Sequence, residues 1–182
     1  MPPSQQMRLL TSSETNEWYT PPAYTDAARE AMGSIELDPA SNPVAQLWIK
    51  ADRCFTAADN GLEQNWAAKT LYCNPPYGLI NGRSGAGLFS AKLINEYEAG
   101  NIGQAILLVF ATPGYSWFND LMGYPMCFCR QRISFIPASS SPVTVSGAAK
   151  KGSVFVYFGS NTGRFKWAFS QFGPIAHFDV QR

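Results

Sequence analysis

The chain has 182 residues, of which 46% are hydrophobic and 15% charged, and these fractions exclude a disordered, collagen-like or coiled-coil protein. The length suits one domain with a sizeable core. The net charge is only +1, but residues 1–120 carry 7 basic and 12 acidic side chains, whereas residues 121–182 carry 7 and 1. This asymmetry indicates a basic surface that faces a polyanion, although uneven charge also arises by chance in small domains.

Cellular location and metal content are predicted from what the sequence lacks. Its longest apolar run, residues 105–111, is too short to span a membrane, and residues 1–18 contain no signal-peptide core. We therefore expect a cytoplasmic protein without a membrane partner. The four cysteines form no CxxC pair and adjoin no histidine cluster, so we expect reduced thiols and no metal site.

The N-terminal part of the chain predicts a tail followed by a helix. Residues 1–16 are polar and are expected to be flexible, and the domain is expected to span residues 17–182. Thr20 is placed to cap a helix, two prolines suit the first turn of this helix, and Gly33 ends it.

Short strands are predicted next. Residues 34–41 form a strand that ends at Asp38. Residues 43–52 are ambiguous, although three of their apolar side chains fit one helical face. Residues 54–62 predict another short strand that runs into a loop.

The centre of the chain predicts a strand, a loop, a helix and a second strand. Residues 70–73 form the first strand, which ends at a rigid corner over residues 74–77. A glycine-rich loop at 78–87 leads into a helix at 88–98. Residues 105–111 are apolar throughout, as in a fully buried parallel strand.

The last third of the chain is predicted to be mainly strands. A short helix at 115–122 precedes strands at 126–136 and 152–160, and residues 173–180 fit an edge strand. A loop of small residues, 137–152, joins two of these strands. Loops of this length in compact domains are either functional or disordered.

The alternation of strand and helix predicts a compact, Rossmann-like α/β fold with a mostly parallel sheet and helices on both faces. Ligands in such sheets bind beyond the carboxyl ends of the strands. Two stiff polar segments follow predicted strands, Asp38–Ser41 and Asn74–Tyr77. We expect them to form the site.

The Asn74-Pro75-Pro76-Tyr77 corner suits methyl transfer to the exocyclic amine of adenine. The lone pair of that nitrogen is delocalised into the ring, and two acceptors aimed at its N–H groups would localise it. The Asn74 side-chain oxygen and the Pro75 carbonyl are the candidates, because the prolines hold the backbone rigid. Tyr77 offers a flat face on which an extruded base can stack. The alternative interpretation is a stiff turn without catalytic function.

These residues and their flanking motifs resemble the phage-encoded DNA N6-adenine methyltransferases, within the wider class of S-adenosylmethionine-dependent amino-methyltransferases. The similar segments are EWYTPP, LDPAS, FTAADNGL and NPPYG, with weaker support from RISF and VFVYFG, and they cover most of residues 17–159. The NPPY motif is shared with methyltransferases of RNA adenine and of protein glutamine. The flanking segments therefore discriminate among these families.

The resemblance implies roles for individual residues. Asp38 and the residues after it would contact the methionine part of the cofactor, S-adenosylmethionine, as would Thr20 and its neighbours. Asp59 would accept a hydrogen bond from the amino group of the cofactor's adenine. The implied cofactor-binding residues are Tyr19, Thr20, Pro21, Asp38, Pro39, Ala40, Ser41, Asp59 and Asn60. The implied catalytic residues are Asn74, Pro75, Pro76 and Tyr77.

Two departures from the family pattern stand out. No glycine-rich turn follows the first strand, and no acidic residue can be assigned to the cofactor ribose, for which Asp52 is only a guess. No separate target-recognition domain fits, so loops and the basic third are expected to contact DNA. The expected substrate contacts are Tyr77, Arg83, Arg132, Lys150 and Lys151. The alternative for the four cationic residues is a solvated side chain that does not contact DNA.

The sequence thus predicts an adenine-specific DNA methyltransferase that uses S-adenosylmethionine, without a metal, as a monomer or homodimer. The resemblance implies that it modifies phage DNA against restriction. Two alternatives stay open. One is N-methylation of RNA adenine or protein glutamine, and the other is a catalytically silent module that binds nucleic acid.

Overall fold

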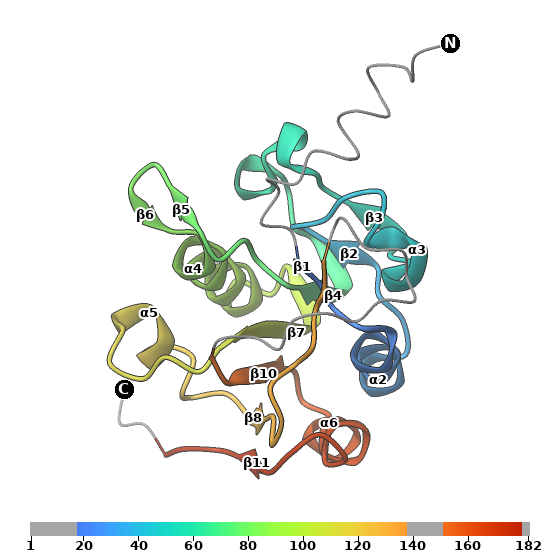
Figure 1. Cartoon of the computed structure of the whole chain (residues 1–182), viewed down its shortest axis with the longest axis vertical. Coiled ribbons are helices and arrows are strands. Elements are labelled where there is room, and N and C mark those ends of the chain that lie inside the picture. Colours follow the sequence, from blue (N-terminus) through green and yellow to red (C-terminus); the bar gives the residue numbers. More distant parts are fainter. Residues whose placement is uncertain (1–17, 138–150, 180–182) are drawn as a thin grey trace.

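The computed structural model describes residues 18–137 and 151–179, which form a seven-stranded sheet with helices on both faces (Figure 1). The strand order is β11-β8-β10-β7-β4-β2-β3. The predicted flexible segment 1–16 and most of the predicted loop 137–152 lie outside the described residues. The domain boundary at residue 17 therefore stays a prediction.

One half of the sheet is parallel and carries the connections that the sequence predicts. It contains β2 (Leu37–Asp38), β3 (Arg53–Cys54), β4 (Ala68–Cys73) and β7 (Ile102–Phe110). Helix α4 (Gly85–Glu98) lies between β4 and β7 in the chain. The predicted α/β fold is confirmed, with a parallel core.

The other half of the sheet is antiparallel. Strand β10 (Ser153–Phe158) pairs with β7 on one side and with β8 (Met126–Phe128) on the other, and β11 (Ile175–Ala176) forms the predicted edge. The register sets Ser153 opposite Phe110. The start of β10 therefore lies at the carboxyl end of β7.

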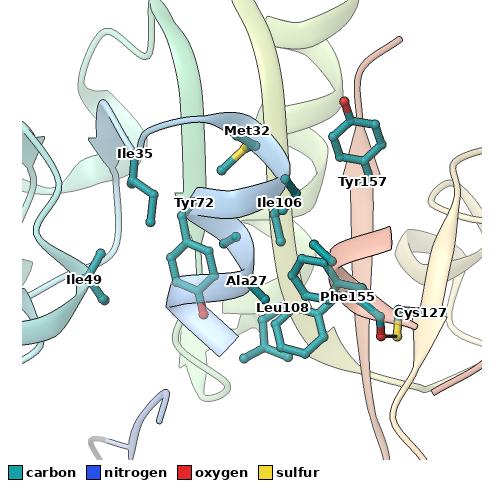
Figure 2. Close-up of a cluster of buried hydrophobic side chains, with 14 of the residues drawn as sticks. Ala27, Met32, Ile35, Ile49, Tyr72, Ile106, Leu108, Cys127, Phe155 and Tyr157 are labelled. Carbon is teal, nitrogen blue, oxygen red and sulfur yellow. Dashed lines mark hydrogen bonds between the residues drawn. The ribbon is translucent and has the colours of Figure 1, made fainter. Parts of the chain in front are cut away.

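Helices α2 (Pro22–Met32) and α6 (Thr162–Phe169) pack against each other on one face of the sheet. Helix α6 is an element that the sequence interpretation missed. The strands supply alternate residues to this face, because successive side chains point to opposite sides. Figure 2 shows several of them near α2: Tyr72, Ile106, Leu108, Phe155 and Tyr157.

The opposite face is covered by α4 and by the short helix α5 (Ser116–Asn119). The intervening strand residues point to this side and are equally buried: Leu71, Leu107, Val109, Val154 and Val156. Since both faces are covered, the central strands read as continuous apolar runs. No helix of the described residues is long and apolar enough to cross a membrane.

The strand predicted over residues 126–136 is wrong as a single element. Strand β8 ends at Phe128, and β9 (Ile136–Pro137) pairs instead with β1 (Trp18–Tyr19) in a separate two-stranded sheet. Between them Ile133 and Phe135 are buried in the core on the α2 side. After β8 the chain therefore leaves the sheet and covers that core with these side chains.

The glycine-rich loop predicted at 78–87 contains a hairpin. Strands β5 (Leu79–Ile80) and β6 (Arg83–Ser84) are joined by Asn81 and Gly82, which have φ angles of 49° and 76°. An Asn-Gly pair with two positive φ angles is the signature of a type I′ turn. Helix α4 begins three residues earlier than predicted, since the Ser84 hydroxyl accepts a hydrogen bond from Gly87 N.

Thr20 does not cap α2, contrary to the prediction. Pro21 occupies the N-cap position without a side-chain bond, although Gly33 ends the helix as expected. The Thr20 hydroxyl accepts a hydrogen bond from the Tyr72 hydroxyl at 2.9 Å. Thr20 is fully buried, and its side chain ties the start of α2 to β4.

Candidate functional site

A cavity of about 430 Å³ lies at the carboxyl end of the parallel strands. Asp38 ends β2, Asn74 follows β4, and Tyr19 ends β1, so the fold brings distant parts of the chain to one place. A cavity of this size is typical of small-molecule sites. The two stiff segments singled out in the sequence therefore face one common cavity.

Most residues assigned to the cofactor or to catalysis line this cavity. These are Tyr19, Thr20, Asp38, Pro39, Ala40, Ser41, Asn60, Asn74, Pro75, Pro76 and Tyr77. The sequence interpretation assigned no role to the other lining residues, of which Thr56, Ala57 and Gly61 lie within the FTAADNGL segment. The rest belong to none of the segments that carry the family resemblance: Asn42, Ala45, Ile49, Ile80 and Phe89.

Pro21 and Asp59 lie outside the lining of the cavity. Asp59 is exposed, and its carboxylate accepts hydrogen bonds from the Thr56 hydroxyl and Thr56 N at 2.7 and 2.8 Å. These two bonds hold the pKa of Asp59 below its ordinary value. The side chain closes a capping box on the 3-10 turn Ala57–Asp59, and its cofactor role stays a prediction. Asp52 is exposed and also lies outside the lining.

Asp38 is the buried carboxyl group of the site, with 1% of its surface exposed. Its oxygens accept hydrogen bonds from Ala40 N at 3.2 Å and from the Gln46 amide at 3.0 Å. Burial raises the pKa of Asp38 to about 6, although bonds from Ser41, Ala40 and Gln46 oppose the shift. A cationic ligand would restore the charged form, because it offsets the desolvation of the carboxylate.

Gln46 holds the loop after β2 in place and was not singled out in the sequence. It lies on the short helix α3 (Gln46–Ile49), within the segment that was ambiguous. Its amide nitrogen donates to Asp38 and, at 2.7 Å, to the Ser41 hydroxyl, while its oxygen accepts from Ala51 N at 2.9 Å. One side chain therefore fixes both ends of the Asp38–Ser41 segment.

Pro39 and Gly61, which both line the cavity, are in close contact. A Cβ atom added at Gly61 would lie 2.0 Å from the Pro39 carbonyl oxygen, so only glycine fits. The Gly61 carbonyl in turn accepts a hydrogen bond from the indole of the buried Trp66 at 2.7 Å. The turn at Asn60 and Gly61 is thus pressed against the segment that carries Asp38.

Tyr77 is fixed by three contacts. Its hydroxyl donates to Asn74 Oδ1 at 2.8 Å and lies 3.3 Å from the Leu108 carbonyl oxygen. Burial of this hydroxyl raises the pKa of Tyr77 well above its ordinary value, which keeps it a neutral donor. The ring stacks on Phe110 with centroids 4.1 Å apart and planes 25° apart. One face of Tyr77 is therefore covered, and a flat ligand can stack only on the other.

The start of α4 holds the corner at residues 74–77 from behind. Gly85 N donates to the Gly78 carbonyl at 2.9 Å. A Cβ atom at Gly85 would lie 2.5 Å from the Pro76 carbonyl oxygen. Helix and corner approach each other so closely that the backbone of the corner has little freedom to move.

The predicted cationic contacts are only partly gathered at this end of the sheet. Lys151 is exposed and precedes β10, where Gly152 accepts a hydrogen bond from Ala111 N just beyond β7. Arg83 and Arg132 are also exposed, on the hairpin and between β8 and β9. Lys150 lies outside the described residues. Arg164 and Lys166 belong to α6 on one face of the sheet, so the cations of the basic third that the structure describes do not all gather at the cavity.

The described residues contain no group of three His, Cys, Asp or Glu side chains that could hold a metal ion. All four cysteines are free thiols. The single histidine, His177, is exposed beyond β11, with Nε2 3.3 Å from the Gly123 carbonyl oxygen.

One comparison with known proteins gave a match. A family model described as DNA N-6-adenine-methyltransferase (Dam) matches residues 8–169. Neither a curated protein nor a solved structure matches the chain. The matched range includes every residue that lines the cavity.

Proposed function

Since the chain belongs to the DNA N-6-adenine-methyltransferase (Dam) family, we propose that it transfers a methyl group from S-adenosylmethionine to an adenine extruded into the cavity between Asp38 and Asn74. The observation that carries this proposal is the meeting of the Asp38–Ser41 segment and the proline corner in one cavity. Family membership makes the enzyme an adenine-specific DNA methyltransferase. RNA adenine, protein glutamine and a silent binding module are therefore not retained.

The residues near Asp38 fit this cofactor. S-adenosylmethionine, when bound, supplies a methyl group activated by a positively charged sulfur. Its methionine part carries an ammonium group, and the buried Asp38 carboxyl is a suitable partner for a cation. We assign the methionine part to Asp38–Ser41 with Tyr19, Thr20 and Pro21. The adenine part is assigned to Asp59 and Asn60.

The proline corner would act on the target base. The Asn74 side-chain oxygen and the Pro75 carbonyl would accept hydrogen bonds from the adenine amine and localise its lone pair. Tyr77 would stack on the base with the face that Phe110 leaves uncovered. The amine loses its proton to water, so no side-chain base is required. His177 lies outside the cavity lining, in keeping with this.

We assign the phosphate contacts to Arg83, Arg132, Lys150 and Lys151, around the DNA that enters the cavity. The enzyme would work as a monomer or homodimer in the cytoplasm, on phage DNA that its methyl groups protect from restriction. The host cytoplasm is the place of reaction if the gene is carried by a phage.

The proposal is tested by transfer of labelled methyl from S-adenosylmethionine to unmethylated duplex DNA, followed by digestion to nucleosides. The expected result is label in N6-methyladenine alone. Label in another nucleoside would refute the assignment of the proline corner. Absence of cofactor binding by calorimetry would refute the assignment of the cavity.

Gly61→Ala is expected to weaken cofactor binding by about tenfold or more, because the added methyl group must push the Asp38–Ser41 segment away. The same strain should lower the free energy of unfolding by about 1–3 kcal/mol. Calorimetric titration and urea denaturation measure the two effects.

Gly163→Ala is the matched control for Gly61→Ala. It lies in α6, and a Cβ atom there would meet nothing within 4 Å. It is expected to bind the cofactor as the wild type does. Wild-type affinity in Gly61→Ala would contradict the position given to the Asp38–Ser41 segment.

A further inference from the structure

The β5–β6 hairpin borders the cavity. Ile80 belongs to the cavity lining, and its neighbour Leu79 is 76% exposed, the largest exposed fraction among the large apolar side chains of the described residues. Figure 1 shows the hairpin projecting beyond α4, away from the sheet. An apolar side chain therefore projects into solvent one residue from the wall of the site.

The hairpin is held rigidly. Its tip is a type I′ turn with defined positive φ angles at Asn81 and Gly82. Its base is closed by the bond between Gly85 N and the Gly78 carbonyl, and Ser84 caps α4. Because successive strand residues point to opposite faces, Ile80 faces the cavity while Leu79 faces away from it. Leu79 is thus presented at a fixed place.

The proposed reaction creates a need for such a side chain. An adenine that leaves the duplex loses its stacking energy and leaves a gap between its neighbours. Proteins that distort DNA often insert apolar side chains between base steps, leucine among them, and the same kind of side chain suits such a gap. Arg83 is exposed and pairs across the hairpin with Ile80, so its side chain lies on the face of the hairpin opposite Leu79 and offers a phosphate a cation on the cavity side.

We propose that Leu79 enters the duplex and occupies the space left by the extruded adenine, while Arg83 on the other face of the hairpin meets a phosphate on the cavity side. This inference rests on the proposed function, since it requires that the base be extruded into the cavity. Leu79 is a positioning residue in this scheme, because it acts on the DNA stack rather than on the reacting amine.

The test compares Leu79→Ala with the wild type on two oligonucleotide duplexes that carry the mapped target adenine. In one the adenine is paired with thymine, and in the other it faces an abasic site, which lowers the cost of extrusion. The expected loss in kcat/KM is about tenfold or more on the paired duplex and at most about twofold on the other. A 2-aminopurine base at the target should fluoresce less with Leu79→Ala than with the wild type.

Two variants sharpen the result. Leu79→Met keeps the apolar volume and should retain the wild-type kcat/KM on both duplexes. Trp167→Ala removes another exposed apolar side chain, which lies on α6 and is 70% exposed, and should leave kcat/KM on both duplexes unchanged. Equal losses on both duplexes, or none on either, would overturn the wedge. Failure of the wild type itself on both duplexes would instead count against the proposed function.

Discussion

Asn74→Ala is expected to lower kcat for methyl transfer by about 10²–10³-fold, the usual cost of removing one preorganised group that stabilises developing charge. The substitution removes the oxygen that we assign to the adenine amine and also the acceptor of the Tyr77 hydroxyl. The affinity for S-adenosylmethionine should change little, because Asn74 borders the cavity on the side assigned to the base. Single-turnover kinetics and calorimetry measure the two quantities separately.

Asn74→Asp and Tyr77→Phe are the matched variants. The aspartate keeps an acceptor oxygen for both partners and should retain far more activity than alanine. Tyr77→Phe keeps the ring stacked on Phe110 and removes the hydroxyl contacts with Asn74 and the Leu108 carbonyl, so its loss measures the contribution of the hydroxyl. Wild-type turnover by Asn74→Ala would refute the catalytic role of the corner.

Relative to the wild type, Asp38→Asn is expected to raise the free energy of unfolding more at high pH than at low pH. It is also expected to weaken cofactor binding. Burial raises the pKa of Asp38 from 3.8 to about 6 in the folded protein. The folded state therefore holds the proton more tightly than the unfolded chain does. Stability from this group is present in acid and is lost as the pH rises through about 6, where the buried carboxylate becomes charged.

The size of the effect follows from the pKa shift. The unfolding free energy of Asp38→Asn minus that of the wild type should be larger at pH 8 than at pH 4 by about 2–3 kcal/mol. Urea denaturation at both pH values gives this difference, and the exposed Asp52→Asn should show no comparable change. Calorimetry should show a loss of cofactor affinity of about tenfold or more for Asp38→Asn. If the unfolding free energies of Asp38→Asn and the wild type differed by the same amount at both pH values, the raised pKa of Asp38 would be refuted.

The order of the central elements was predictable because both faces of the sheet are covered. Strands buried on both sides have apolar residues in succession, so β4, β7 and β10 are recognisable in the sequence. The positions of Asp38 and Asn74 followed from the same patterns, since polar residues that end buried strands meet at one edge. The pair Asn81-Gly82 is typical of a hairpin turn, but the glycines around it led to the prediction of an irregular loop at 78–87.

The supporting residues of the site could not be predicted. Gln46 and Phe110 are ordinary by type and spacing, and each acquires its role only through tertiary contacts with Asp38 and Tyr77. The break after β8 has the same origin. Ile133 and Phe135 continue an apolar pattern that suits a strand, yet the core on the α2 side takes them away from the sheet.

The contact between Gly85 and the corner has a consequence for how such an enzyme changes its target preference. The Gly78–Gly85 bond closes the hairpin, and the same Gly85 abuts the Pro76 carbonyl, so the hairpin that we assign to the duplex and the corner that we assign to the adenine share one joint. A substitution at Gly85 would displace the corner at residues 74–77 and would therefore impair methyl transfer. Ile80 of the hairpin also lines the cavity, so a change of the hairpin that alters target preference would also alter the wall of the site.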